Sequence, residues 1–126
     1  MNVREYSAIL QVIIHDCPLV IHWSMEFDEI TLQVGYFKGM LEFIGGSTLY
    51  FIEFVDTSEA EAVKRLKYKY HWQSESGELI ARWDNVPHHR DINSFPHHKH
   101  DINGVQPSEP ADLKSVLNII MEGLEE

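Results

Sequence analysis

The sequence is short of cysteine, of basic residues and of long hydrophobic runs, and each shortage excludes a class of protein. Its 126 residues contain a single cysteine, Cys17, which excludes an internal disulfide and a multi-cysteine zinc knuckle. No stretch approaches ~20 uninterrupted apolar residues, so we predict no membrane-spanning helix. The first residues lack an apolar run with a small-residue cleavage site, so we predict no secretory signal. These shortages together predict a cytoplasmic protein.

Basic residues are half as numerous as acidic ones, but they are concentrated in one part of the chain. Lys and Arg number 10 against 20 Asp and Glu, a net charge of −10, which argues against general nucleic-acid binding. Residues 64–100 nevertheless hold seven Lys or Arg, four Asp or Glu and six of the eight histidines. This distribution favours either one localised anion-binding face or an uneven charge without functional meaning.

The length and a hydrophobic content of 44% predict a single folded domain over residues 1–126. Apolar residues spaced by three and four predict an amphipathic helix over residues 2–15 and a last helix that Ser108-Glu109-Pro110 opens. The Ser-x-x-Glu string at residues 58–61 predicts a short helical turn at most. The segment 19–27 stays open between a strand and irregular structure.

Strands are predicted where the apolar period changes to two or where β-branched and aromatic residues gather. The predicted strands are residues 30–37, 39–44, 47–56, 66–73 and 78–84. Both faces of 47–56 are apolar, which predicts a central strand covered on each side by helices or a partner subunit. The expected fold class is α+β, with an antiparallel sheet of about five strands and an N-terminal and a C-terminal helix packed on it.

The strand at 66–73 separates aromatic from basic side chains. Its core face is predicted to be Leu66, Tyr68, Tyr70 and Trp72, and Lys67, Lys69 and His71 lie on the other face. A paired strand at 78–84 would place Arg82 or Asp84 beside that polar face. For the lysines alone, an ordinary solvated surface is the better interpretation.

Five of the eight histidines lie between residues 82 and 101, in two clusters that each follow a proline. The clusters are His88 and His89 after Pro87, and His97, His98 and His100 after Pro96. Histidine titrates between pH 5 and 8 without help, so such a concentration suits proton transfer, metal binding or phosphate binding. If residues 97–102 pair back onto the sheet, His98 and His100 share one side while His97 and Lys99 share the other.

The first chemistry that these residues suit is metal-independent cleavage of RNA, in which a base, an acid and cations act on one phosphate. Acid and base would be His97 and His98, or His98 and His100, with Lys99 and Arg82 holding the phosphate. Asp84 and Asn85 would orient the histidines or cap the turn. The other residues predicted to bind or orient substrate are His71, His88, His89, Arg90 and Tyr70, and for Tyr70 a core position is the stronger interpretation.

The second chemistry is metal binding. His98 and His100 would both point at one ion, completed by His88, His89 or Asp84, and the ligand types suit zinc, nickel or manganese. The spacing matches no sharp metal motif. The first interpretation requires no metal and no other cofactor.

Several strings resemble the TumE-like family of small toxins. They are Tyr68-Lys69-Tyr70-His71-Trp72-Gln73, Arg82-Trp83-Asp84-Asn85 and Phe95-Pro96-His97-His98-Lys99-His100. The resemblance extends from about Gly35 to the terminal helix, and Trp83 stands where tyrosine is expected. It implies the toxin component of a type II toxin–antitoxin system, with a small helix-turn-helix antitoxin as partner. No catalytic residue is carried over from the family.

The sequence therefore predicts a toxin that acts as a ribonuclease, with RNA and an antitoxin as partners and self-association into a homodimer left open. The alternative is a non-enzymatic module that binds a metal or a partner through the histidine-rich segment.

Overall fold

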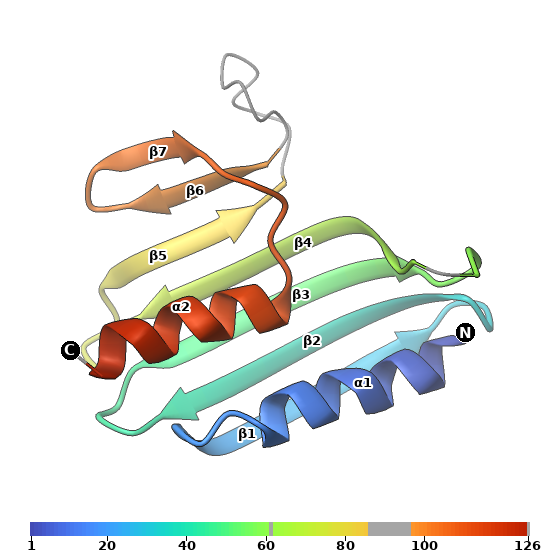
Figure 1. Ribbon diagram of the computed structural model, residues 1–126, viewed down its shortest axis with the longest axis horizontal. Helices are drawn as coiled ribbons and strands as arrows, with labels where there is room; N and C mark the ends of the chain where they lie inside the picture. The colour runs from blue at the N-terminus through green and yellow to red at the C-terminus, as the bar shows by residue number, and fades with distance from the viewer. Residues whose placement is uncertain (61, 86–96, 126) are drawn as a thin grey trace.

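The computed structural model describes residues 1–60, 62–85 and 97–125, which form two helices and a seven-stranded sheet (Figure 1). The strands pair antiparallel in chain order, so every neighbour in the sheet is also a neighbour in sequence. The elements are α1 (Val3–His15), β1 (Val20–Glu29), β2 (Val34–Phe43), β3 (Thr48–Asp56), β4 (Lys64–Gln73), β5 (Leu79–Asp84), β6 (His98–Asp101), β7 (Gly104–Pro107) and α2 (Leu113–Glu125).

The predicted class and both helices are confirmed, but the predicted start of the second helix and the prediction of about five strands are wrong. Helix α2 begins at Leu113 and not at 108–110, because Asp112 caps it: Asp112 Oδ1 accepts a hydrogen bond from the Ser115 amide (2.7 Å). Strand β1 is an edge strand and is exposed along most of its length, so it lacks the alternation that marks a half-buried strand. Strands β6 and β7 have four residues each, too few to establish a period. These three strands, together with the merging of two predicted strands into β2, give seven strands in place of the predicted five.

Two local predictions are also wrong. The segments 30–37 and 39–44 contain a single strand, β2, because Gly39 continues it. The ring of Phe51 on β3 packs where a Cβ of residue 39 would lie, so glycine is needed there for close packing. The helical turn at 58–61 does not form in the described residues, because the Ser58 amide donates a hydrogen bond to Asp56 Oδ1 (2.9 Å). Glu61 lies outside the described residues.

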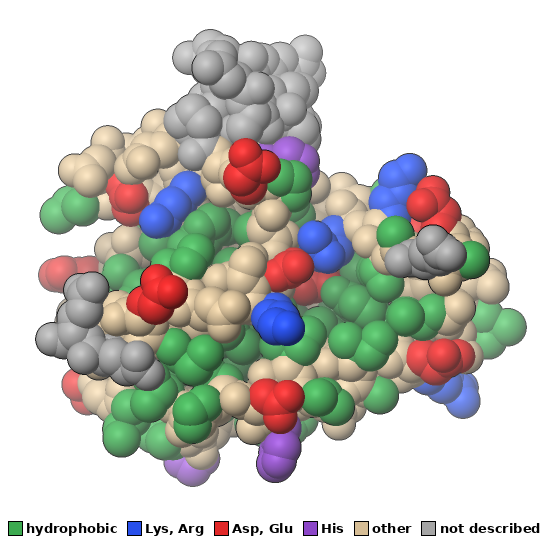
Figure 2. Space-filling view, in the orientation of Figure 1, with side chains coloured by type: hydrophobic (Ala, Val, Ile, Leu, Met, Phe, Trp, Pro, Cys, Tyr) green, Lys and Arg blue, Asp and Glu red, His purple; other side chains and the backbone are tan. Residues whose placement is uncertain are grey.

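Helices α1 and α2 pack on one face of the sheet, and no helix of residues 1–60, 62–85 and 97–125 lies on the opposite face (Figure 1). Of the predicted cover on each side of β3, by helices or a partner subunit, the described helices supply one side, and a partner subunit on the other side stays a prediction. Figure 2 shows the helix side, where hydrophobic side chains fill much of the surface around a few acidic and basic ones. We call the opposite side the open face.

The hydrophobic core lies between the helices and strands β2 to β5. The side chains that the helices cover are the apolar stripes of α1 and α2 and every second residue of each central strand. The largest fully buried apolar side chains are Tyr68, Tyr70, Phe37, Phe43, Phe51, Leu10, Ile14, Leu41, Leu49, Leu113 and Ile120. The prediction that Tyr68, Tyr70 and Trp72 belong to the core is confirmed.

Leu66 was predicted on that core face but is 45% exposed. The register between β3 and β4 shifts between Phe54 and Val55, which places Arg65 opposite Val55. Such a bulge adds one residue to a strand and turns its side chains to the other face. It turns Leu66 outward and brings Arg65 to the helix side.

Neither helix in the described part of the chain is long and apolar enough to cross a membrane.

Candidate active site

The open face carries a cluster of one carboxylate, two imidazoles and one guanidinium where β5 pairs with β6. Asp84 is opposite His98, and Arg82 is opposite His100. Residues directly opposite each other on antiparallel strands share a face, as do residues two apart on one strand. The register therefore brings all four side chains to the same side, and we call them the Asp84 cluster.

Asp84 is the centre of this cluster. Its Oδ1 lies 2.6 Å from His98 Nε2, and its Oδ2 lies 3.6 Å from His100 Nε2 and 3.5 Å from Arg82 Nε. The rings of His98 and His100 meet edge to face, with centroids 4.8 Å apart. A carboxylate with three such neighbours fixes the orientation of both imidazoles.

Burial divides the cluster into an inner and an outer part. Asp84 and His98 are each 2% exposed, whereas the side chains of His100 and Arg82 are 14% and 33% exposed. A dissolved substrate would therefore meet His100 and Arg82 first. Asp84 and His98 lie behind them.

Strand β4 adds a further imidazole beside the cluster. His71 is opposite Arg82, and Lys69 is opposite Asp84, as predicted from the alternation of residues 66–73. His71, Arg82 and His100 thus form one row across β4, β5 and β6. Burial, followed by the positive charges of Arg82 and Lys69, lowers the pKa of His71 below its usual value of 6.5, so this imidazole is neutral at pH 7.

Three predicted site residues lie on the helix side instead. The ring of His97 stacks on Tyr68 with centroids 5.8 Å apart, and its Nδ1 lies 2.8 Å from the Tyr68 hydroxyl. The Lys99 ammonium lies 5.1 Å from the centre of the Trp83 ring. The Tyr70 hydroxyl donates a hydrogen bond to Glu53 (2.7 Å). The predicted separation of His98 and His100 from His97 and Lys99 is confirmed.

Asn85 connects strands rather than contacting the histidines. Its Oδ1 accepts a hydrogen bond from the Tyr68 amide (2.9 Å), and its Nδ2 donates one to the Leu66 carbonyl (3.3 Å). The side chain thereby continues the β4–β5 pairing beyond the last residue of β5. The remaining predicted positions, His88, His89 and Arg90, lie outside the described residues.

A buried carboxylate on the helix side escaped the sequence analysis. Glu53 on β3 is fully buried and accepts hydrogen bonds from the hydroxyls of Tyr6 on α1 and Tyr70 on β4. Burial raises the pKa of Glu53, and the two hydrogen bonds oppose that rise. Because Tyr6 and Tyr70 come from different layers, this carboxylate ties α1 to the centre of the sheet.

A sequence signal for Glu53 existed. It is the one charged residue among the inward-facing positions of β3, which are otherwise Leu49, Phe51 and Val55. A carboxylate in such a stripe requires buried partners. The partners themselves could not be read from the sequence, because Tyr6 is 47 residues away.

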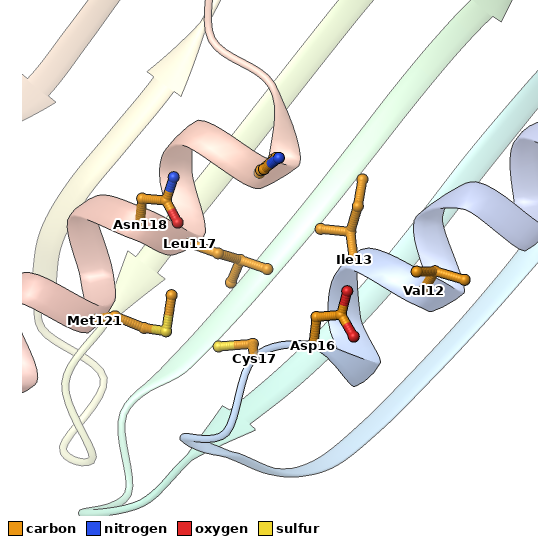
Figure 3. Close-up of a pocket in the computed structure, with 8 residues that line it drawn as sticks. Val12, Ile13, Asp16, Cys17, Leu117, Asn118 and Met121 are labelled. Atoms are coloured by element: carbon orange, nitrogen blue, oxygen red, sulfur yellow. The ribbon is translucent and has the colours of Figure 1, made fainter.

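Cys17 lines a separate pocket between the C-terminal end of α1 and the middle of α2 (Figure 3). Val12, Ile13, Leu117 and Met121 supply most of its apolar wall. Burial raises the pKa of the Cys17 thiol, so the thiol stays protonated and unreactive near neutral pH. This pocket lies on the helix side and supplies nothing to the Asp84 cluster on the open face.

Three members of the Asp84 cluster also satisfy the first requirement of a metal site. One ligand atom from each of Asp84, His98 and His100 lies within 4.8 Å of the other two. Two imidazoles and a carboxylate suit zinc and other first-row divalent ions. The cluster thus has the chemistry for either proton transfer or metal binding.

The comparisons with known proteins identify the family. A family model described as "Toxin TumE" matches residues 10–126. The chain belongs to the TumE toxin family. No curated protein and no solved structure is similar enough to match.

Membership confirms the resemblance that the histidine and Arg82-Trp83-Asp84-Asn85 strings indicated. The matched residues include every strand of the sheet and both parts of the Asp84 cluster. A toxin family implies an antitoxin as partner. The family description assigns no reaction to these residues, so the chemistry has to be argued from their geometry.

Proposed function

We propose that this TumE-family toxin is an endoribonuclease and that it cleaves RNA at the row formed by His71, Arg82 and His100. The observation that carries the proposal is the register that places a guanidinium between two imidazoles on the open face. A phosphate bound by Arg82 would have one histidine on each side. That arrangement suits acid–base cleavage, in which proton donor and acceptor act on opposite sides of the phosphorus.

The two histidines differ in a way that suggests their roles. His71 has a lowered pKa and is neutral at pH 7, so it would accept the proton of the 2′-hydroxyl. The 2′-oxygen then bonds to phosphorus, the bond to the 5′-oxygen breaks, and His100 protonates that leaving oxygen. The products are a 2′,3′-cyclic phosphate and a 5′-hydroxyl. Because the attacking group is the 2′-hydroxyl, the reaction is restricted to RNA.

Asp84 and His98 would be positioning residues in this scheme. Asp84 Oδ2 lies 3.6 Å from His100 Nε2 and would orient the imidazole that donates the proton. Asp84 also lies 3.5 Å from the Arg82 Nε and holds the guanidinium in place. His98, buried beside Asp84, fixes the carboxylate from the opposite side. The cognate antitoxin, which we expect to be a small helix-turn-helix protein, would suppress the activity.

The proposal is tested by incubating antitoxin-free protein with total RNA and with defined oligonucleotides, in the presence and absence of EDTA. His100→Ala is expected to lower the cleavage rate by roughly 10²–10⁴, the usual contribution of a general acid or base. His97→Ala is the matched control, because His97 lies on the opposite side of the sheet. No cleavage by folded wild-type protein, or equal rates for both variants, would refute the proposal.

A metal-dependent nuclease is the second candidate, because the ligand atoms of Asp84, His98 and His100 lie within 4.8 Å of one another. These residues would hold a divalent ion, which supplies Lewis-acid stabilisation of a phosphate. Cleavage that survives EDTA supports acid–base catalysis. Cleavage that EDTA abolishes and one added ion restores, together with stoichiometric metal in the purified protein, supports the metal site.

A further inference from the structure

The open face continues from the Asp84 cluster toward the centre of the sheet as a surface of aromatic and basic side chains. Tyr50 on β3 is opposite His71, so it extends the row His71–Arg82–His100 by one strand. Tyr50 is 47% exposed although it lies on a central strand. Neighbouring strands are about 4.8 Å apart, so Tyr50 lies roughly 14 Å from His100 across the sheet.

Two further rows run parallel to this one. Ile52, Lys69, Asp84 and His98 form the second, and Phe54 and Lys67 begin the third. Tyr36 on β2 is opposite Phe54 and adds another half-buried ring. The open face between β2 and β5 thus alternates flat rings with cations, and the Asp84 cluster lies at its end.

We propose that this surface is a binding platform for single-stranded RNA, with bases stacking on Tyr50 and its aromatic neighbours and phosphates bound by Lys67, Lys69 and Arg82. The proposal rests on the proposed ribonuclease function and specifies its substrate as single-stranded RNA. A flat sheet with exposed rings binds unstacked bases, whereas a duplex keeps its base faces covered by stacking. Single strands are therefore favoured over duplexes.

Charge selects RNA over a protein partner as the occupant. Lys67 and Lys69 are exposed and form no ion pair within the described residues, although the chain as a whole has a net charge of −10. Of the carboxylates on this face, Glu42 and Asp56 lie at opposite ends of the β2–β3 pair, and Asp84 is buried and already has three positively charged or protonatable neighbours. The middle of the face therefore presents the uncompensated positive charge of Lys67 and Lys69, which phosphates neutralise.

Acidic residues limit the platform on one side. Glu26 and Asp28 on β1 share the open face and lie opposite Lys38 and Tyr36. They would repel phosphate at that edge of the sheet. The strand of RNA is therefore expected to cross from β3 to β6, toward His100, and not toward β1.

The test is a binding titration of antitoxin-free protein with a fluorescent single-stranded oligonucleotide of 2′-O-methyl RNA, which has no free 2′-hydroxyl and cannot be cleaved. Wild-type protein is expected to bind it more tightly than the same oligonucleotide annealed to its complement. Tyr50→Ala should weaken single-strand binding roughly 5- to 150-fold, the usual effect of losing one stacked base. Tyr50→Phe keeps the ring and should bind normally, and Trp23→Ala, a similarly exposed aromatic on β1, is the control for losing a surface ring.

The cations are tested by the salt dependence of the same titration. Lys67→Ala should reduce the slope of log affinity against log salt concentration by about 0.7, the value for one phosphate contact to a single strand. Lys114→Ala removes an exposed lysine from α2 on the helix side and should leave the slope unchanged. Thermal unfolding of each variant establishes that it is folded.

Three outcomes would overturn the platform. The first is an unchanged affinity of Tyr50→Ala for the single strand, and the second is tighter binding of the duplex than of the single strand by wild-type protein. The third is that Tyr50→Ala loses antitoxin binding or self-association while it retains RNA binding. If wild-type protein cleaves ordinary RNA but Tyr50→Ala and Lys67→Ala bind it normally, the platform alone fails. If the single strand binds as expected but ordinary RNA stays intact, the ribonuclease proposal fails and the platform stands.

Discussion

Replacing Asp84 by asparagine is the sharpest test of the cluster, because it removes one negative charge while keeping the size of the side chain. Asp84 and His98 are each 2% exposed, and their atoms lie 2.6 Å apart. An amide would turn its NH₂ group toward at least one of the three nitrogens that now face the carboxylate. The variant therefore removes the negative charge beside these nitrogens without creating a cavity.

The expected loss of stability follows from that burial. Breaking a buried ion pair by removing one partner costs about 3–5 kcal/mol. Because the amide oxygen of the introduced asparagine would still face one of these nitrogens, we expect the lower end, about 3 kcal/mol. For a chain of this length, about 1 kcal/mol lowers Tm by roughly 4 °C, so Tm should fall by roughly 12 °C. A domain with a typical stability of about 5–15 kcal/mol remains folded at 25 °C.

Activity is the second readout of the same variant. At a temperature where Asp84→Asn is folded, cleavage of RNA should fall by roughly 10²–10⁴, because Arg82 and His100 lose the group that orients them. Asp101→Asn is the matched control: Asp101 lies on β6, and its carboxylate accepts hydrogen bonds from Asn103 and Gln106 outside the cluster. If the two variants have equal Tm values and equal rates, the reasoning about the Asp84 cluster is wrong.

Two predictions concern the buried carboxylate on the helix side. Tyr6→Phe and Tyr70→Phe each remove a hydrogen bond to Glu53 and should lower the free energy of unfolding by about 1.5–3 kcal/mol. Tyr50→Phe is the control, because its hydroxyl is on the open face and its loss should change the free energy of unfolding little. Denaturant titrations measure the free energy of unfolding of all three variants. Because burial raises the pKa of Glu53 in the folded state, the unfolded chain loses this proton first as pH rises. Stability should then decline from about pH 4.3 through the folded-state pKa. Glu53→Gln should lack this part of the decline, and an identical pH profile for both proteins would contradict the assignment.

Local periodicity predicted much of this fold and one essential feature of the site. The stripes of residues 2–15 and of the C-terminal segment, together with the alternation of 66–73, are properties of neighbouring residues, so they can be read without tertiary information. The same period of two predicted that His98 and His100 share a side while His97 and Lys99 share the other. It also predicted that Arg82 and Asp84 lie beside His71.

Other features depended on contacts between distant segments. Alternation tells which residues share a face of a strand, but not which face the helices cover, and β3 is apolar on both of its faces. Only the packing of α1 and α2 on one side made the Asp84 cluster part of an open face. The bulge that turns Arg65 inward arises from the pairing of β4 with β3.

The sequence by itself determined the residue types, their alternation and the family, because each is carried by short strings of neighbouring residues. The tertiary structure decided which of those residues meet. It joined Asp84 to His98 and His100 across two strands, buried the first pair, and placed His97 on the far side of the sheet. Burial and cross-strand register are properties of the assembled sheet, and they separate a histidine-rich sequence from a defined site.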